Sequence, residues 1–282
     1  MTQTDRDAYT RMFAPDGTVL LHPDRPVARY RPLRAVHNFQ KLMKDKEDTA
    51  LVFKIFESLP SKDFMPRVKA LALSETGEAL RASEPDLPDI LDDHASLRRT
   101  PKGSVAHAYC DFMEAEGLSA AGLVAEYDRV GRPKYPDLVE WYINRNRDTH
   151  DLFHVLTGYG RDALGEQCVL LFTHGQQPSQ GHLLIGYAGA ANIAKTVRAS
   201  GSKAPVFGAV RQAHRTGKGA PQLMAQPIRE LLARRLEDVR RDLRIPDPSV
   251  YRECHRIWRV EGIDPYDLLS STKPAEPELL AA

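Results

Sequence analysis

The 282-residue chain has little cysteine, no excess of either charge and no long apolar run. Its three cysteines, Cys110, Cys168 and Cys254, are far apart and form no C-x-x-C pair. This argues against both a disulfide framework and a thiolate zinc site. Each cysteine is therefore expected to be a small buried apolar side chain in a reducing compartment.

Charge is nearly balanced, because 39 Lys and Arg residues stand against 38 Asp and Glu residues, for a formal net charge of +1. A globally basic binder is excluded, and no nucleic-acid partner is expected. Apolar residues make up 42% of the chain, which is enough to bury a sizeable core and excludes wholesale disorder.

No stretch reaches the roughly 18 uninterrupted apolar residues of a membrane span. The longest candidate, residues 183–197, contains Asn192 and Lys195. The first residues lack the basic-then-apolar pattern of a signal peptide. The expectation is a cytoplasmic protein, peripherally associated with the inner (cytoplasmic) membrane.

Alternating strand patterns are nearly absent, and helical spacing of apolar residues dominates. The predicted fold class is all-α, with a single helical domain over residues 31–260. An irregular N-terminal arm (1–30) precedes it, and a flexible C-terminal tail (261–282) follows. Asp48, Ser104 and Ser119 are predicted helix caps. Long helices are predicted over 137–156 and 227–244, and a loop or short turns of helix over 84–93.

One motif stands out: His150, Asp151 and His154, followed by glycines at 158 and 160 and by Glu166. Residues four apart share a helical face, so the two imidazoles can converge on one point. A turn at the glycines lets the next helix bring Glu166 back to them. Two histidines with one or two carboxylates suit zinc or a similar divalent ion, with a position left open. Asp151 is either a further ligand or the group that handles a proton.

The adjacent histidine and aspartate also allow a second interpretation, a metal phosphohydrolase of the HD type. Such an enzyme needs further dispersed ligands, and His94, Asp92 and Asp93 are the candidates.

The central block, residues 147–158 with Leu164, Gly165 and Glu166, resembles the coenzyme Q (ubiquinone) biosynthesis protein 4 family. Pro101, Gly103, Ser104 and Tyr109 resemble an upstream element of that family, and the likeness extends over about residues 36–246. The segment 158–160 departs from the family's usual form.

The resemblance implies an all-α protein that binds a divalent metal, usually zinc, and removes the C1 carboxylate of a polyprenylated hydroxybenzoate, with or without oxidation. Its alternative is a non-catalytic polyprenyl-lipid-binding scaffold that organises the ubiquinone biosynthetic complex. The implied partners are a polyprenylated benzenoid lipid, other ubiquinone-pathway enzymes and a membrane surface, and a homodimer is left open.

Two further features bear on a lipid ligand. The small-residue segment 181–191 offers an apolar groove at Leu184, Ile185, Gly186 and Gly189, or else a site of close helix packing. Arginines gather on the predicted last helix, at 234, 235, 240, 241 and 244, as a solvated face or as a patch for anionic lipid headgroups.

Overall fold

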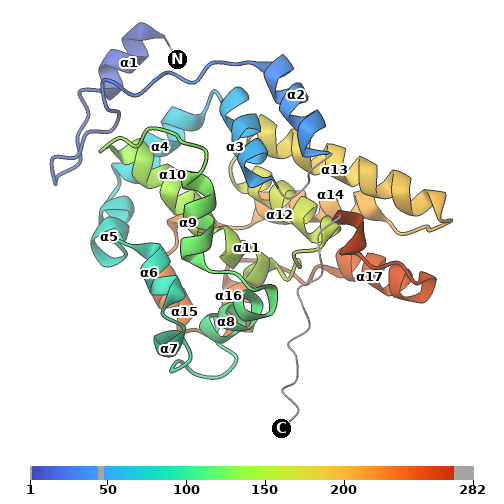
Figure 1. The fold of residues 1–282 in the computed structure, drawn as a ribbon. Coiled ribbons are helices and arrows are strands. Elements are labelled where there is room, and N and C mark those ends of the chain that lie inside the picture. The colour runs from blue at the N-terminus through green and yellow to red at the C-terminus, as the bar shows by residue number, and fades with distance from the viewer. Residues whose placement is uncertain (1, 44–47, 270–282) are drawn as a thin grey trace.

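The structure is a computed structural model that describes residues 2–43 and 48–269. The all-α prediction is confirmed: the described residues form helices joined by loops, with only two isolated β-bridges (Figure 1). Within these ranges, no helix combines the length and the apolar character that crossing a membrane requires. All three cysteines are free and buried, as predicted.

The helices follow one another along the chain as α1 (Gln3–Tyr9), α2 (Pro32–Leu42), α3 (Thr49–Ser58), α4 (Phe64–Ala72), α5 (Glu75–Ser83), α6 (Leu87–Asp92), α7 (His94–Leu97), α8 (Val105–Glu116), α9 (Ala120–Asp128), α10 (Leu138–Asp148), α11 (His150–Thr157), α12 (Ala163–Gln176), α13 (Gln180–Ala199), α14 (Val206–Gly219), α15 (Ile228–Leu232), α16 (Leu236–Asp242) and α17 (Ser249–Glu261). The 3-10 turns η1 (Leu223–Ala225) and η2 (Asp267–Leu269) complete the described elements.

Helix α12 lies in the middle of the fold and packs against both α13 and α14 (Figure 1). Its apolar residues Leu164 and Phe172 are fully buried, and Phe172 packs edge-on against Phe153 of α11. Helix α17 closes the far side of α14, where Trp258 is fully buried. Helix α12, which carries Glu166, is therefore packed on both sides.

Helices α2 and α3 form a pair at the edge of the fold. Ala35 and Leu42 of α2 pack against Ile55 and Leu59 of α3, and Ile185 of α13 joins the same cluster. The pair is thus held to α13 through α3, while the other face of α2 is exposed.

The N-terminal segment contains helix α1 and is fastened to the fold. Leu20 and Leu21 are buried, and the Arg25 guanidinium lies 2.7 Å from both the Asp137 and the Glu140 carboxylates at the start of α10. The domain boundaries drawn from the sequence stay a prediction, and residues 270–282 of the expected tail lie outside the described residues.

The predictions of two long helices are wrong, because in each case the structure has two shorter helices. The stretch 137–156 divides into α10 and α11 at Thr149, whose hydroxyl donates to the Arg145 carbonyl and competes with the helix ladder. The stretch 227–244 divides into α15 and α16, because Arg235 is extended and forms a bridge with Ser104. This second break is a tertiary effect that helical spacing cannot reveal.

Other local predictions fare better. Asp48, Ser104 and Ser119 each cap a helix, by accepting a bond from the backbone N–H three residues later. Within 84–93 the chain forms the short helix α6. Glu84, which ends α5, is buried and paired with Arg145 at 2.8 Å.

Candidate metal centre

Three of the four predicted metal ligands meet at one point. The ligand atoms of His150, His154 and Glu166 all lie within 4.8 Å of one another. Nε2 of His154 is 3.8 Å from Oε1 of Glu166, and the two imidazole rings are 5.2 Å apart, edge to face. Two imidazole nitrogens and a carboxylate oxygen are the donor set of many catalytic zinc sites, so these residues fit a divalent metal.

The local sequence explains how the group assembles. His150 and His154 lie one turn apart on α11, which ends at Gly158 in the left-handed conformation (φ +75°). The chain then reverses, and α12 starts against the loop. A Cβ on Gly165 would lie 1.9 Å from the Gly160 carbonyl oxygen, so only glycine allows this contact. The close approach places Glu166 opposite the two histidines.

A hydrogen-bond network fixes the same loop from the other side. Asp162 caps α12 by accepting from the N–H groups of Leu164 and Gly165. The Tyr251 hydroxyl donates to Asp162 and accepts from the Gly160 N–H. The loop between the ligands is therefore held at both ends.

His154 is oriented for ligation. Its Nδ1 lies 3.1 Å from the Tyr159 carbonyl oxygen, which can only accept, so Nδ1 carries the proton. Its Nε2 then bears the lone pair that faces Glu166. The ring also stacks on Phe112, with centroids 5.3 Å apart. This arrangement matches the outer-shell hydrogen bond that metal-bound histidines usually make.

Burial sets the protonation of the group. It lowers the pKa of His150 and of His154, so both imidazoles are neutral at pH 7 with a lone pair available. It raises the pKa of Glu166 to about 7, against the opposing effect of His150. The Glu166 side chain is 26% exposed, and it lines a large cavity.

Asp151, the fourth predicted ligand, lines the same cavity but lies outside the three-residue group. It is 9% exposed. Burial, followed by the negative charge of Asp151, raises the pKa of Tyr109, whose hydroxyl is buried and has no hydrogen-bond partner among the described residues. Whether Asp151 acts as a ligand or as a proton carrier stays a prediction.

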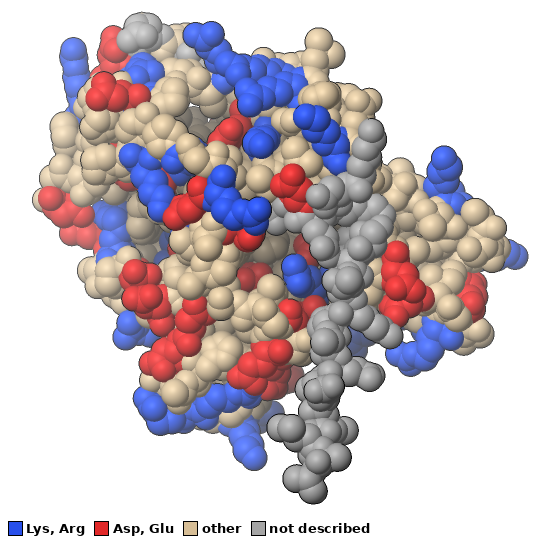
Figure 2. Space-filling view, viewed as in Figure 1, with Lys and Arg blue, Asp and Glu red and all other residues tan. Residues whose placement is uncertain are grey.

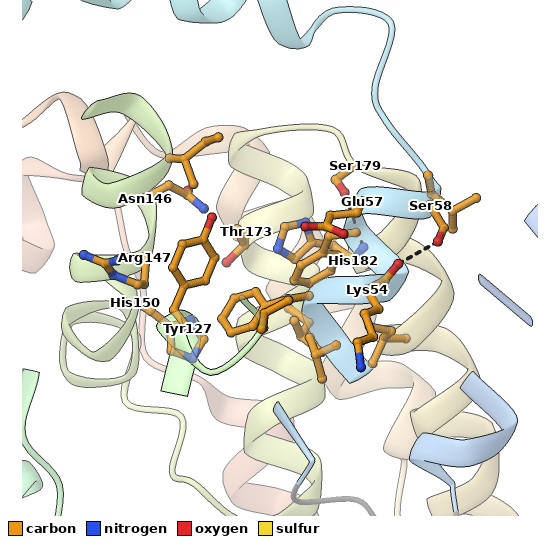
Figure 3. Close-up of a pocket in the computed structure, with 18 of the residues that line it drawn as sticks. Lys54, Glu57, Ser58, Tyr127, Asn146, Arg147, His150, Thr173, Ser179 and His182 are labelled. Carbon is orange, nitrogen blue, oxygen red and sulfur yellow. Dashed lines mark hydrogen bonds between the residues drawn. The ribbon is translucent and has the colours of Figure 1, made fainter. Parts of the chain in front are cut away.

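The group opens on a cavity of about 2350 Å³ that extends from α11 and α12 to α2 and α3. Figure 3 shows His150, Tyr127 and His182 around one space, from α11, α9 and α13. Pockets for drug-sized ligands measure about 300–1,000 Å³, so this cavity suits a much longer ligand.

Two polar residues of the cavity wall were not singled out from the sequence. The Oε1 of Gln167 and the Nδ1 of His182 are buried without a hydrogen-bond partner in the described part of the chain. Burial lowers the pKa of His182 to about 3, and its ring lies 4.4 Å from that of Phe56. The only sequence feature that could have drawn attention to Gln167 is its position directly after Glu166.

The residues of the predicted groove divide between two roles. Ile185 and Gly189 line the cavity, whereas Leu184 and Gly186 do not. A Cβ on Gly186 would lie 1.6 Å from Leu171 Cδ2, so Gly186 serves the close crossing of α12 and α13. Gly186 thus has a packing role, and the use of the segment as a lipid groove stays a prediction.

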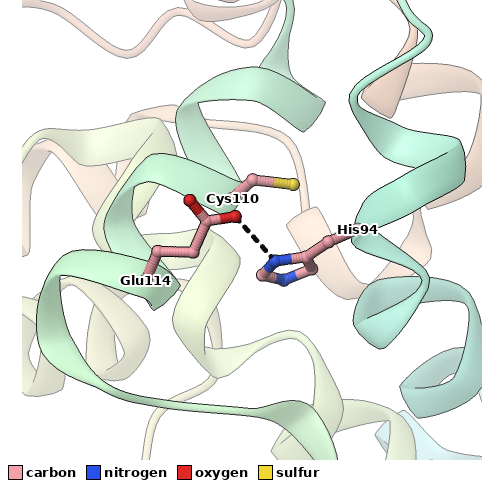
Figure 4. Close-up of side chains that lie close together, drawn as sticks. All are labelled: His94, Cys110 and Glu114. Carbon is pink, nitrogen blue, oxygen red and sulfur yellow. Dashed lines mark hydrogen bonds and ion pairs between the residues drawn. The ribbon is translucent and has the colours of Figure 1, made fainter.

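A second group of potential ligands, His94, Cys110 and Glu114, lies between α7 and α8 (Figure 4). Here the Glu114 carboxylate is already paired, with His94 Nδ1 at 3.0 Å and with the Arg98 guanidinium at 2.7 Å. The guanidinium supplies the positive charge that a cation would bring. This group is therefore explained as an ion-pair network.

The HD-type interpretation loses its candidate ligands. Asp92 accepts from the N–H groups of Ala120 and Ala121 at the start of α9, and Asp93 caps α7 through Ser96. His94 belongs to the Glu114 network. None of the three joins His150 and His154 in the metal group.

Most arginines of the predicted basic helix are engaged within the chain. Arg240 donates to the carbonyls of Val155 and Leu156 at the C-terminal end of α11, where the helix dipole favours a positive charge. Arg234 pairs with Asp242, and Arg241 with Asp238.

Taken together, fold and site define a class: all-helical proteins with a His–His–Glu group that lines a large cavity. The family model described as "Coenzyme Q (ubiquinone) biosynthesis protein Coq4" matches residues 42–249. The chain belongs to this family, and the resemblance seen in the sequence is confirmed.

Curated relatives agree. The chain is 26% identical over 208 residues to the "Ubiquinone biosynthesis protein COQ4, mitochondrial" of Arthroderma otae, covering 72% of this chain and 73% of that one. It is 25% identical over 207 residues to the protein of that name from Aspergillus terreus, covering 72% and 68%. Both names place the relatives in mitochondria, so they lend no support to the predicted cytoplasmic location.

The fold is also known. A crystal structure from Nostoc punctiforme, described as that of a candidate ubiquinone biosynthesis protein, superposes with a TM-score of 0.57. It is 20% identical and covers 77% of this chain and 100% of its own. At that identity the match speaks for the fold alone.

Proposed function

We propose that this ubiquinone-biosynthesis protein is a metal-dependent enzyme that removes the C1 carboxylate of a polyprenylated hydroxybenzoate. The observation that carries the proposal is the continuity between the metal group and the cavity: His150, His154 and Glu166 line the space that extends to α2 and α3. A ligand with a polar ring and a long apolar chain has that shape.

In this proposal His150, His154 and Glu166 hold a divalent ion, with zinc as the metal predicted from the family. Such an ion supplies a Lewis acid that binds the ring carboxylate and stabilises negative charge on oxygen. The protein orients the ring through the cavity wall, where Gln167 and His182 offer unpartnered polar atoms. The apolar part of the cavity, including Phe56, Leu170 and Ile185, takes the prenyl chain.

The chemistry of the chain's own residues is a proton transfer. The bond between C1 and its carboxylate breaks, carbon dioxide leaves, and the electron pair stays on the ring carbon. Asp151, or a water molecule held by it, delivers the proton that replaces the carboxylate.

The alternative is a non-catalytic scaffold that holds a polyprenyl lipid and docks pathway enzymes. It is supported by the position of the group, since a metal held by His150 and His154 of α11 and by Glu166 of α12 would fasten the two helices together. Peripheral attachment to a membrane is part of both proposals, and homodimer formation remains a prediction.

The two functions are separated by complementation of a ubiquinone-deficient strain. The His150→Ala/His154→Ala variant is compared with the wild type for metal content, folding and rescue. A variant that folds, lacks metal and fails to rescue supports the enzyme. A metal-free variant that still rescues supports the scaffold, and equal metal content in both proteins rejects the site.

A further inference from the structure

Exposed apolar side chains are concentrated on a short segment around the start of α2. Of the seven large apolar residues that are most exposed in the described ranges, four lie between positions 27 and 36: Val27, Tyr30, Leu33 and Val36. Leu33 is 85% exposed. Large apolar side chains gathered on one surface mark a place of contact with another body.

The exposed apolar residues lie on the outer face of α2. The inner face, with Ala35, Asn38 and Leu42, is buried against α3. Leu33 and Val36 are one turn apart and so share the opposite face. Packing among the described residues therefore leaves Leu33 and Val36 exposed.

The same segment carries positive charge that forms no ion pair with any other described residue. Arg29, Arg31, Arg34 and Lys41 are exposed, and none forms an ion pair in the described part of the chain. Residues 25–43 contain no Asp or Glu. Figure 2 shows Lys and Arg side chains gathered at the upper edge of the molecule, where α2 and the segment before it run. On α16, in contrast, Arg241 pairs with Asp238 and Asp242, and Arg240 donates to the carbonyls of Val155 and Leu156.

The surface also borders the cavity. Arg29, Tyr30, Arg31 and Arg34 line the same space as the metal group. A ligand that entered past these residues would reach His150 within one continuous cavity.

We propose that residues 27–36 dock the protein on an anionic phospholipid bilayer, with Leu33 and Val36 inserted among the lipids and the arginines at the headgroups. An apolar strip flanked by unpaired cations is the pattern of helices that lie in a membrane interface. A second protein would need acidic residues to match these cations, whereas an anionic bilayer supplies negative charge at every point. The inference rests on the proposed lipid substrate and adds the route by which that substrate enters.

Sedimentation with lipid vesicles tests this proposal on the full chain. Phosphatidylcholine vesicles, with and without one third phosphatidylserine, are mixed with the wild type, with Leu33→Ser/Val36→Ser and with Arg29→Gln/Arg31→Gln/Arg34→Gln. The wild type is expected to bind the anionic vesicles preferentially. Loss of the three arginines should weaken that binding on the order of 100-fold, since each basic residue near a surface contributes about fivefold.

Matched controls come from other exposed helices. Val260→Ser replaces an apolar side chain that is 80% exposed on α17, and Arg211→Gln/Arg215→Gln/Lys218→Gln removes the same charge from α14. Both controls should bind vesicles like the wild type. Equal losses in the α2 and α14 charge variants would overturn the proposal, as would wild-type protein that ignores anionic vesicles.

Two further readouts keep the outcomes apart. If α2 instead joins two copies of the chain, Leu33→Ser/Val36→Ser will turn a dimer into a monomer in ultracentrifugation, and this also contradicts membrane docking. Metal content is measured in every variant and is expected to be unchanged. Wild-type protein that binds vesicles but holds no metal would reject the proposed enzyme and leave the docking surface standing.

Discussion

His154 uses both nitrogens of its ring: Nδ1 lies 3.1 Å from the Tyr159 carbonyl oxygen, and Nε2 lies 3.8 Å from Glu166 Oε1. The first contact ties the histidine to the loop that follows α11. The contact of Nε2 directs the lone pair of His154 toward Glu166 on α12. The predictions on the metal group follow from this double contact.

Glu166→Gln should remove a charged ligand without disturbing the fold. We expect zinc affinity, measured by competition with a chromophoric chelator, to fall on the order of 100-fold or more, because even outer-shell changes cost 10- to 100-fold. Glu57→Gln is the matched control, since Glu57 lines the same cavity from α3 (Figure 3) but lies outside the metal group. Equal affinity in both variants would reject Glu166 as a ligand.

Gly165→Ala should weaken the metal group by displacing Glu166, the next residue. Its Cβ would press on the Gly160 carbonyl, so we expect a loss of about 1–3 kcal/mol in the free energy of unfolding and weaker zinc binding. Gly219→Ala, at the end of α14 with open space around it, should be neutral or slightly stabilising. Urea unfolding measures the first effect and chelator competition the second. A Gly165→Ala protein as stable as Gly219→Ala contradicts the close approach.

Asp148 gives a dependence of stability on pH. Burial raises its pKa to about 6 from 3.8, although the nearby Arg147 lowers it. The group thus favours folding while protonated, and this contribution is complete below pH 4 and lost as the pH rises through 6. In metal-free protein, Asp148→Asn should be about 2 to 3 kcal/mol more stable than the wild type at pH 7.

The gap between Asp148→Asn and the wild type should close as the pH falls below 4. Asp128→Asn, which removes an exposed partner of Lys134, should show little such change, because exposed pairs contribute at most about 1 kcal/mol. Urea midpoints at several pH values decide the matter. A constant difference across this range would show that Asp148 does not carry the raised pKa.

Gly186→Ala tests the packing role within the small-residue segment. The added methyl group would overlap Leu171, which is fully buried, so the expected loss is about 1–3 kcal/mol in the free energy of unfolding. Ligand capacity of the cavity should change little, because Gly186 does not line it. Unchanged stability would mean that α12 and α13 do not cross this closely.

The metal group was accessible to sequence reasoning because its determinants are local. His150 and His154 are one turn apart, and the glycines between them and Glu166 mark the reversal of the chain. Helix caps such as Ser104 are equally local. These features depend on spacing and on residue type rather than on distant partners.

The rest depends on contacts between distant segments. The break between α15 and α16 comes from the backbone bridge between Arg235 and Ser104. The carboxylate of Asp92 accepts a hydrogen bond from the start of α9 and is therefore not part of the metal group. The cavity is lined by residues of many helices, so no single sequence segment predicts it. The exposed apolar segment 27–36 crosses the boundary predicted at residue 31 between the irregular arm and the helical domain, because the sequence alone does not tell which apolar residues find a partner.

The central claim is tested most directly by release of labelled carbon dioxide from a prenylated hydroxybenzoate that carries the label in its carboxylate. Purified protein is assayed as isolated, after removal of metal by a chelator, and after addition of zinc. The account predicts release by the isolated and the reloaded protein and none by the stripped one. Release that persists without metal, or in the His150→Ala/His154→Ala variant, would contradict it.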